Sequence, residues 1–436
     1  MKGLVIGSDK SGGGKTTLTM GIMKALCNRK YKVQGYKVGP DYIDPGFHSF
    51  ICGTDSRNLD THLMGEDGVK ASFSRGIGDI GVIEGVMGFY DGMGIGTDCS
   101  TAHVARLVDL PVVLVLSPQA QMATLFAQIN GILAYEKNNI VGVILNNISQ
   151  NYYERLKVGI ENQCGLKVFG YLPRDPKLEI GSRSLGLIQS TEIEDLREKI
   201  DYLAIQIEKY VDVQGIIDCM GQAAQYEDPF KLEKQDLKIG IAKDQAFNFY
   251  YKENLELLEQ LGEVTYFSPL EDKKLPDDLD FLYIGGGYPE IFAKELSENK
   301  SILNDMKEKL NQGLRCYAEC GGMLYLTQGT KESPLVGFFE GEYHVSKRLQ
   351  NFGYARLTIC EENPILPKGL EMNCQEFHRS YVALKEPSVY CINKEQYDGS
   401  EKSWTCGYQK KNTIGTYAHT HFFGNIEMLK NLLKLK

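Results

Sequence analysis

A glycine-rich segment with two lysines, Lys10-Ser11-Gly12-Gly13-Gly14-Lys15-Thr16-Thr17, follows a short apolar run at residues 4–8. The backbone N–H groups of such a loop, at the start of a helix, form a cradle for an anion. Lys15 is then placed to reach the outer phosphates of a nucleotide, and the Thr16 hydroxyl is a ligand for Mg²⁺. The loop is a variant, because Asp9 stands where glycine is usual. We predict that Gly12, Gly13, Gly14, Lys15, Thr16 and Thr17 bind ATP.

Acidic side chains follow two further apolar runs. Glu84 ends the run at 80–85, with Asp91 seven residues later, and the segment Asp41-Tyr42-Ile43-Asp44 follows a run that carries Lys37. Carboxyl ends of parallel strands meet at one edge of a sheet, where ligands gather. Mg²⁺ prefers oxygen ligands, and a lysine attracts a carboxylate or phosphate. We expect Thr16, Glu84 and Asp44 to hold Mg²⁺, and Lys37, Asp41, Tyr42, Asp44 and Asp91 to bind substrate.

A cysteine between a strand and a glycine pair predicts a second reactive site. In Ala318-Glu319-Cys320-Gly321-Gly322, a sharp strand-to-helix turn would expose Cys320, and the helix N-terminus would favour its thiolate. Another strand ends in a glycine loop, where Gly286 and Gly287 offer N–H groups for an oxyanion hole. The thiol also needs a base that meets it in space. The candidates are His378, His419 and His421.

The elements that must position these residues alternate between β and α along the chain. Continuous apolar runs separated by amphipathic stretches predict parallel sheets covered on both faces. The pattern stops near 211 and restarts near 236, so we predict an α/β chain with two units, residues 1–210 and 236–436. They are joined by a linker at 211–235 that has room for one short helix. Beyond about 335 the pattern becomes more β-like. The expected strands lie at 4–8, 33–38, 80–85, 111–116, 140–146, 168–173, 238–243, 264–268, 280–287 and 315–320.

Charge, hydropathy and cysteine spacing argue against several classes of function. The 436 residues carry a formal net charge of −9, which argues against a broad nucleic-acid surface. No apolar run reaches the ~20 residues that span a bilayer, and the N-terminal segment does not resemble a signal peptide. The eleven cysteines lack a zinc-site spacing, because Cys316 and Cys320 have no second pair at the required distance. We therefore expect a cytoplasmic protein with reduced cysteines and neither nucleic-acid nor membrane partners.

From residue 3 to about 425 the chain resembles the cobyrinic acid a,c-diamide synthase family. Its N-terminal half is similar to dethiobiotin synthetase, a phosphate-loop enzyme that activates a carboxylate. Its C-terminal half is similar to the cobalamin-pathway branch of class I glutamine amidotransferases. The resemblance rests on the phosphate loop and on the segments 36–48, 58–60, 84–92, 244–251, 285–290 and 318–322.

The resemblance implies a reaction. Glutamine would be hydrolysed at Cys320 through a thioester, with His419 as base, and would release ammonia. ATP would phosphorylate the a and c acetates of cobyrinic acid in turn, and ammonia would attack each acyl phosphate. The implied partners are cobyrinic acid, ATP and L-glutamine, with Mg²⁺ as cofactor, and a homodimer is one option for the assembly.

Three positions depart from the family pattern. Gln375 replaces the first histidine of a Gly-His-Glu-Phe-His segment, and Ser184 replaces a histidine in Arg-His-Leu-Gly-Leu. The amidotransferase pattern His-x-Glu reads His419-Thr420-His421, which leaves the third member of the cysteine–histidine site unassigned.

Two kinds of alternative stay open. Nickel-sirohydrochlorin and hydrogenobyrinic acid also present acetates, so the same diamidation on either is a rival reading. A rival of another class is a phosphate-loop ATPase of the partitioning or metal-insertion kind, which shares the variant loop at Lys10 but needs no Cys320.

Overall fold

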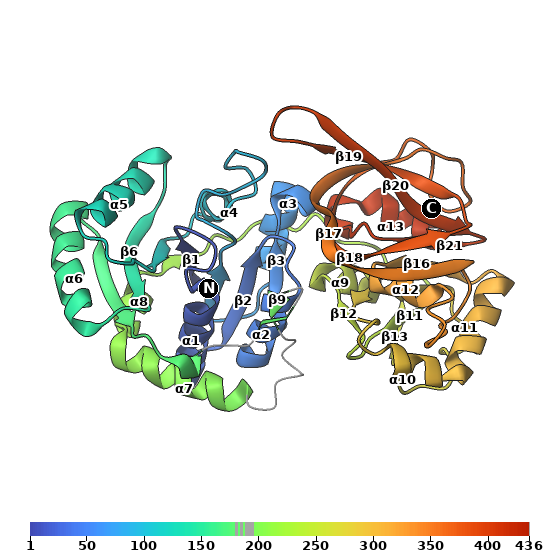
Figure 1. The fold of residues 1–436 in the computed structure, drawn as a ribbon, viewed down its shortest axis with the longest axis horizontal. Helices are drawn as coiled ribbons and strands as arrows, with labels where there is room; N and C mark the ends of the chain where they lie inside the picture. Colours follow the sequence, from blue (N-terminus) through green and yellow to red (C-terminus); the bar gives the residue numbers. More distant parts are fainter. Residues whose placement is uncertain (179–181, 184–185, 188–195, 436) are drawn as a thin grey trace. The chain divides into compact units, whose positions relative to one another are not determined.

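The structure is a computed structural model that describes residues 1–178, 182–183, 186–187 and 196–435. The chain divides into two compact units, each built on its own sheet (Figure 1). Unit 1 comprises Met1–Thr61 and Glu66–Pro229, and unit 2 comprises His62–Gly65 and Phe230–Lys436.

Unit 1 is built on a parallel sheet in the order β3-β2-β4-β1-β5-β6-β7, which confirms the expected fold class. All six strands expected in this half are present, and the short β3 is an addition. The strands are β1 (Lys2–Ser8), β2 (Val33–Val38), β3 (Arg57–Leu59), β4 (Ile80–Glu84), β5 (Val112–Leu116), β6 (Ile140–Asn146) and β7 (Lys167–Leu172), with β8 (Ser182–Arg183) and β9 (Gly186–Leu187) forming a separate pair.

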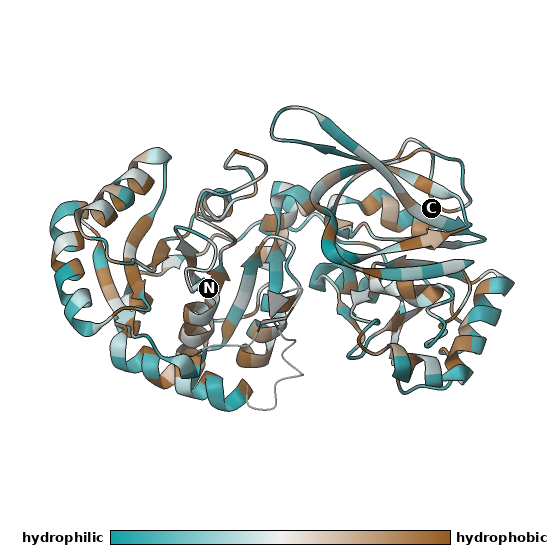
Figure 2. Cartoon of the chain, viewed as in Figure 1, coloured by the Kyte–Doolittle hydropathy of each residue, from teal (hydrophilic) through white to brown (hydrophobic). Residues whose placement is uncertain are grey.

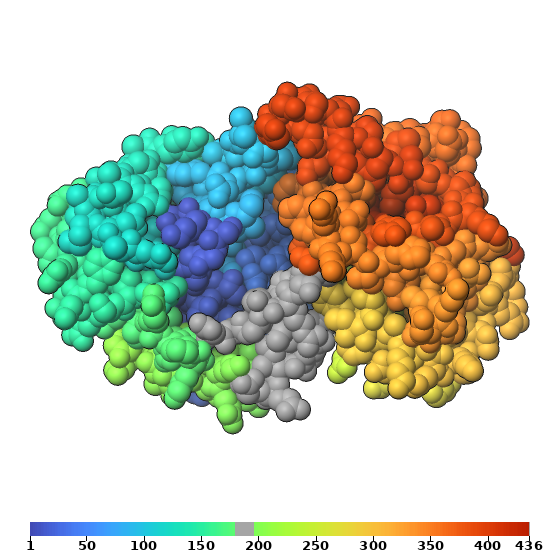
Figure 3. Space-filling view, viewed as in Figure 1, coloured from blue at the N-terminus to red at the C-terminus, as the bar shows by residue number. Residues whose placement is uncertain are grey.

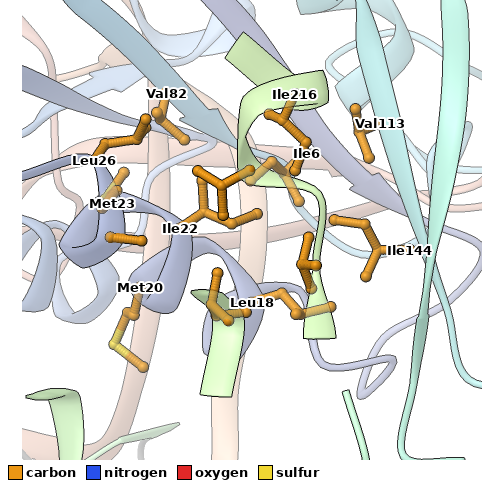
Figure 4. Close-up of a cluster of buried hydrophobic side chains, with 14 of the residues drawn as sticks. Ile6, Leu18, Met20, Ile22, Met23, Leu26, Val82, Val113, Ile144 and Ile216 are labelled. Carbon is orange, nitrogen blue, oxygen red and sulfur yellow. The ribbon is translucent and has the colours of Figure 1, made fainter. Parts of the chain in front are cut away.

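Helices cover this sheet and bury its apolar strands. Figure 4 shows Leu18, Ile22 and Leu26 of α1 packed with side chains of the central strands. Figure 2 shows apolar central strands and banded helices, as expected when one stripe of each helix faces the core. The helices are α1 (Lys15–Asn28), α2 (Ile43–Cys52), α3 (Thr61–Ser74), α4 (Thr101–Leu107), α5 (Ala123–Tyr135), α6 (Gln150–Cys164), η1 (Pro176–Leu178) and α7 (Leu196–Tyr210).

Part of the segment expected as a linker is folded. Val213–Cys219 forms α8, and Gly221–Gln222 forms β10, which pairs antiparallel with β1. Ile216 and Ile217 belong to the same buried cluster as α1, so burial of apolar side chains holds this segment against unit 1. The boundary between the units falls at Pro229 and Phe230.

Unit 2 combines a parallel half-sheet with an antiparallel extension, in the order β13-β11-β14-β16-β21-β20-β19-β17-β18. Strands from β13 to β21 run parallel, and those from β20 to β18 run antiparallel, in agreement with the β-rich pattern expected beyond 335. The strands are β11 (Lys238–Ala242), β12 (Phe247–Phe249), β13 (Glu263–Phe267), β14 (Phe281–Ile284), β15 (Gly286–Gly287), β16 (Arg315–Glu319), β17 (Gly341–Ile359), β18 (Glu371–Leu384), β19 (Ser388–Glu395), β20 (Glu401–Lys410) and β21 (Thr413–Thr416).

The helices of unit 2 flank its parallel strands (Figure 1). They are α9 (Lys252–Leu261), α10 (Ala293–Glu298), α11 (Lys300–Gln312), α12 (Gly321–Leu326), η3 (Phe422–Gly424) and α13 (Ile426–Leu433). Within the described parts of both units, no helix combines the length and the hydropathy that crossing a membrane requires.

The expectation that every cysteine is reduced is wrong for one pair. Cys360 and Cys391 form a disulfide, with their Cα atoms 5.8 Å apart. The sheet brings them together, because Cys360 follows the last residue of β17 and Cys391 lies in the neighbouring strand β19. Thirty-one positions separate the two cysteines in the sequence, so spacing along the chain gave no sign of the pairing.

Candidate active sites

The phosphate loop connects β1 to α1 and is fixed by the end of β6. Gly14 adopts a φ of +92°, and a Cβ there would lie 2.0 Å from Nδ2 of Asn146. That same Nδ2 donates a hydrogen bond to the carbonyl of Gly13 over 3.0 Å. Only glycine fits this close approach in a left-handed conformation. The loop is therefore shaped by side chains from a distant strand as well as by its own glycines.

Lys15 and Thr16 open α1 at the carboxyl edge of the sheet. The Nζ of Lys15 donates to the carbonyl of Met87 over 2.5 Å and to that of Lys10 over 3.3 Å. Burial, and then the positive charge of Lys37, lower the pKa of Lys15. Two cations this close to one another form a site that favours an anion.

Lys37 and Glu84 face each other as register partners in the adjacent parallel strands β2 and β4. The Nζ of Lys37 lies 2.9 Å from Oε1 of Glu84 and 2.6 Å from Oδ2 of Asp44. Thr16 completes the cluster, since its hydroxyl donates to Oε1 of Glu84 over 2.5 Å and lies 3.5 Å from Oδ2 of Asp44. The structure thus brings together four residues that the sequence placed at three separate strand ends.

Glu84 is fully buried and remains ionised. Burial by itself would raise its pKa, but Lys37 and hydrogen bonds from His48 and Thr16 outweigh burial and lower it. His48 Nε2 lies 2.7 Å from Oε2 of Glu84, and its Nδ1 lies 3.3 Å from the hydroxyl of Ser56. His48 is a site residue to which the sequence pattern assigned no role. Its only signal was its place four residues after Asp44, on the same face of α2.

The oxygen donors at this edge suit a hard divalent cation. A hydroxyl and two carboxylates, from Thr16, Asp44 and Glu84, are the ligand types that Mg²⁺ takes in nucleotide sites.

Two of the acids expected to bind substrate also accept backbone hydrogen bonds within their loops. Oδ1 of Asp41 accepts the backbone N–H of Ile43 over 2.7 Å at the start of α2, where Tyr42 precedes the helix. Oδ2 of Asp91 accepts the N–H of Gly88 over 2.9 Å within the turn after β4.

In unit 2, Cys320 sits on a strained turn between β16 and α12. Its φ of 48° and ψ of −105° lie outside the regions that residues with a side chain ordinarily adopt. Such strain is kept where the surrounding structure holds it, typically at reactive sites. The backbone N–H of Cys320 donates to the carbonyl of Thr416 over 2.6 Å, which ties the turn to the end of β21. The expected nucleophile turn is therefore present.

Two glycine loops converge on this turn. A Cβ on Gly321 would lie 2.8 Å from Cδ of Pro289 and 3.0 Å from the backbone nitrogen of Gly287. A Cβ on Gly286 would lie 2.8 Å from Cε1 of His419. The loop expected to supply oxyanion donors therefore lies against both the cysteine turn and the histidine ring.

His419 is the histidine that meets Cys320. Its Nδ1 lies 3.6 Å from Oε2 of Glu319, and its ring interacts electrostatically with both Cys320 and Glu319. Burial would lower the pKa of His419, but these two partners raise it to about 10. Glu319 is therefore the carboxylate nearest in position to the third member, which the sequence left unassigned. It comes from the residue directly before the cysteine instead of from a His-x-Glu segment.

Glu319 is itself held by several donors. The hydroxyl of Tyr283 donates to its Oε2 over 2.9 Å, while the backbone N–H and hydroxyl of Thr420 donate to its Oε1 over 3.2 Å and 3.3 Å. The carboxylate is only 1% exposed, so these contacts fix its orientation toward His419.

The other two candidate histidines have carboxylate partners of their own. Nε2 of His421 lies 3.4 Å from Oε2 of Glu253 in α9. Nε2 of His378 lies 3.1 Å from Oε2 of Glu376, and its ring stacks on Tyr417 with centroids 3.7 Å apart. Tertiary structure thus selects His419 from the three.

Comparison with known proteins places the whole chain in one family. Residues 4–187 match the CobQ/CobB/MinD/ParA nucleotide binding domain, and residues 238–426 match the CobB/CobQ-like glutamine amidotransferase domain. The chain is 60% identical to the cobyrinate a,c-diamide synthase of Clostridium tetani and 55% identical to that of Clostridium acetobutylicum, with 100% of each chain covered. The chain belongs to the cobyrinate a,c-diamide synthase family. The enzyme of that name from Caldanaerobacter subterraneus subsp. tengcongensis is 40% identical over 98% of this chain and 97% of its own.

Membership of the cobyrinate a,c-diamide synthase family agrees with the two sites described above. The matched nucleotide-binding domain contains the phosphate loop and the Lys37–Glu84 cluster, and the matched amidotransferase domain contains Cys320 and His419. The family resemblance predicted from sequence motifs is confirmed. Ser184, one of its noted departures from the family pattern, lies outside the described residues.

Proposed function

We propose that this protein uses ATP and glutamine to amidate the a and c acetates of cobyrinic acid. The observation that carries the proposal is full-length identity of 60% to a cobyrinate a,c-diamide synthase. The two clusters of reactive side chains support it, because one suits phosphoryl chemistry and the other suits glutamine hydrolysis. The names of the relatives point to cobyrinic acid in preference to nickel-sirohydrochlorin or hydrogenobyrinic acid.

In the proposed glutaminase half-reaction, the Cys320 thiolate attacks the amide carbon of glutamine. Backbone N–H groups of Gly286 or Gly287 and of the first turn of α12 stabilise the resulting oxyanion. His419 gives a proton to the departing ammonia, then takes one from the water that hydrolyses the thioester. Glu319 holds the imidazole of His419 in orientation and stabilises its protonated form, as the carboxylate of a catalytic triad does.

In the proposed synthetase half-reaction, the phosphate loop and Lys15 hold ATP while an acetate oxygen of the substrate attacks the γ-phosphorus, and the β–γ bond breaks to release ADP. The acyl phosphate that forms has a good leaving group, which the free carboxylate lacks, and ammonia displaces phosphate to give the amide. Thr16, Asp44 and Glu84 would hold Mg²⁺, which when bound offsets phosphate charge. Lys37, Asp41, Tyr42 and Asp91 are proposed to bind the substrate.

Mass spectrometry of products tests the substrate. The purified protein is supplied with ATP, glutamine and Mg²⁺, and cobyrinic acid, hydrogenobyrinic acid and nickel-sirohydrochlorin are offered in separate reactions. We expect a mass change of two amide substitutions on cobyrinic acid. Diamidation of one of the other two macrocycles alone would replace the proposed substrate and keep the reaction class.

The partitioning-type ATPase remains a rival only if glutamine is not used. Such an ATPase needs the phosphate loop but has no use for the Cys320–His419–Glu319 arrangement. ATP hydrolysis without glutaminase activity or amide formation would favour it over the synthase.

A further inference from the structure

A bulged segment of β17 displays one exposed aromatic side chain beside two lysines. The register of β17 against β18 shifts between Val345 and Gln350 and again between Gln350 and Gly353, so residues in between leave the ladder. Asn351 and Gly353 adopt positive φ angles of 43° and 107°, which let the backbone turn within the bulge. Bulges of this kind redirect side chains and occur beside binding sites.

The redirected aromatic side chain lies against another on β18. Phe352 and Phe377 form an edge-to-face pair with ring centroids 5.2 Å apart. Both are exposed, at 55% and 39%. Burying such a pair against an apolar plane is favourable, so a flat macrocycle suits this surface.

Lys394 and Lys402 lie directly opposite each other in the β19–β20 hairpin, which lies at the surface in Figure 3. The Nζ of Lys394 donates to the carbonyl of Phe352, and the Nζ of Lys402 donates to Oδ1 of Asn351 over 2.8 Å. Both ammonium groups are therefore anchored to the bulge that carries the exposed ring.

The two lysines have no acidic partner among the described residues, since no carboxylate lies within 4.0 Å of either Nζ. The neighbouring Glu395 and Glu401 alternate to the opposite face of the hairpin. Glu376, the buried acid nearby, already accepts from Trp404 over 3.0 Å and from His378. Like charges directly opposite in a sheet are unfavourable, and a bound anion would relieve the repulsion.

We infer that Phe352, Phe377, Lys394 and Lys402 form a docking subsite for the tetrapyrrole substrate on unit 2. The ring plane packs on the two phenylalanines, and peripheral carboxylates pair with the two lysines. A planar, apolar ring edged by carboxylates matches both halves of this surface, whereas glutamine lacks the apolar plane. The inference rests on the proposed function, because it assumes a tetrapyrrole substrate.

Trp404 supplies a built-in probe for the test. It is the only tryptophan in the sequence, and the Nζ of Lys402 lies 5.5 Å from its ring centroid. Cobyrinic acid is titrated into the full chain at constant ionic strength, and quenching of Trp404 fluorescence gives Kd. The wild type, Lys394→Ala/Lys402→Ala and Phe352→Ala/Phe377→Ala are compared, with Lys368→Ala and Tyr397→Ala as exposed controls. Thermal unfolding of every variant establishes that it is folded.

We expect Kd to rise about 5- to 30-fold in each double variant, from the loss of two charge contacts or of two ring contacts. Lys394→Arg/Lys402→Arg is expected to keep Kd within about threefold, because the charge is retained, and added salt should weaken wild-type binding more than that of the lysine-to-alanine variant. The KM for glutamine and the basal glutaminase rate should not change in any of them.

Three results would overturn the subsite. One is an unchanged Kd for cobyrinic acid in both double variants while the wild type amidates cobyrinic acid. That result would overturn the subsite and leave the proposed function intact. Another is an equal rise in the two control variants. The third is a wild type that neither binds nor amidates any of the three macrocycles, in which case the proposed function fails as well.

Discussion

Glu319 Oε2 lies 3.6 Å from Nδ1 of His419, while Glu319 directly precedes Cys320 in the chain. One strand end, β16, therefore supplies both the thiol and the carboxylate that orients the base. The histidine follows the end of β21, the strand beside β16, and is held by backbone pairing with Gln375. A cysteine and an acid that share one strand end keep their relative position whenever that strand is formed.

Replacing Glu319 by Gln should lower glutaminase kcat by between about 10-fold and 10⁴-fold, because an amide neither holds the required tautomer of His419 nor stabilises its charge. The KM for glutamine should change less than about threefold, since Glu319 acts through His419. Steady-state glutaminase kinetics measure both. Glu253→Gln, which alters the buried pair with His421, serves as the matched control and should keep kcat per folded molecule within about threefold. Unchanged turnover in Glu319→Gln would remove Glu319 from the site.

The ring of His419 should titrate near pH 10, because its interactions with Cys320 and Glu319 raise its pKa to about 10 against the opposing effect of burial. A pKa raised in the folded state stabilises the fold below the unfolded value of about 6.5, and that contribution is lost as pH rises through about 10. NMR titration of the histidine rings, with His419→Gln for assignment, gives the value. Cys320→Ala and Glu319→Gln should each lower it, and a value near 6.5 in the wild type would contradict the ion-paired arrangement.

Two variants should separate the half-reactions. Cys320→Ala should abolish amidation with glutamine and leave ammonia-dependent amidation intact, because the thiol acts only in ammonia release. Lys15→Ala should stop ATP-dependent amidation from either nitrogen source while basal glutaminase turnover persists. Amide formation and glutamate release are measured in parallel. A folded Cys320→Ala protein without the ammonia reaction, or full amidation by Lys15→Ala, would show that the two sites do not divide the chemistry as proposed.

Gly321→Ala should cost most of the glutaminase activity. Its methyl group would meet Cδ of Pro289 at 2.8 Å and the nitrogen of Gly287 at 3.0 Å, so the proposed oxyanion loop has to move. Losing one oxyanion donor lowers kcat by about 10²- to 10³-fold in enzymes of this kind. Ammonia-dependent amidation is the internal control and should persist. Wild-type glutaminase kcat in this variant would exclude the loop from catalysis.

Lys37→Met should destabilise unit 1 by about 3–5 kcal/mol at pH 7.5, because it leaves Glu84 and Asp44 buried without their cation. In the wild type, Lys37 helps to lower the pKa of Glu84, so the stabilisation is present above the unfolded value of about 4.3 and is lost as pH falls below it. The deficit of the variant should therefore shrink as pH falls below about 4.3. Urea unfolding followed by circular dichroism measures it at each pH.

The exposed pair of Lys70 with Glu66 gives a matched control for that substitution. Lys70→Met should cost less than about 1 kcal/mol, since a partly solvated ion pair at 4.0 Å contributes little. A Lys37→Met deficit equal to that of the control, or one that grows as pH falls, would contradict the buried-cluster account.

The strands and the phosphate loop could be predicted from the sequence, because each is specified by residues that are neighbours in the chain. The run at 4–8, the glycines that follow and Lys15 specify a strand, a loop and a helix within one segment, and the structure places β1 and α1 there. The apolar run at 315–320 and the glycines after it likewise predicted the Cys320 turn. The segment at 211–235 was predicted as a linker with room for one short helix, and α8 lies there. Its packing against unit 1 was not predicted, because Ile216 and Ile217 gain their stabilisation only against the α1 core.

The sequence pattern did not predict which residues, distant in the chain, contact one another in the fold. Residue types alone left three histidines as candidates for the base, and only the family resemblance pointed to His419. Each of the three lies beside a carboxylate in the structure. His48 gave no chemical signal until α2 placed it on Glu84. The disulfide of Cys360 and Cys391 depends on strands that become neighbours only in the sheet.

The sequence by itself determined the kinds of chemistry: a phosphate loop, a cysteine at a strand-to-helix turn, and acids at strand ends. These features follow from side-chain type and from the backbone conformation that neighbouring residues in the chain favour. Tertiary structure decided which groups lie together, namely Lys37 with Glu84 and Asp44, and His419 with Cys320 and Glu319. Such pairs require strands distant in sequence to pack side by side, and their energies depend on burial that no local pattern encodes.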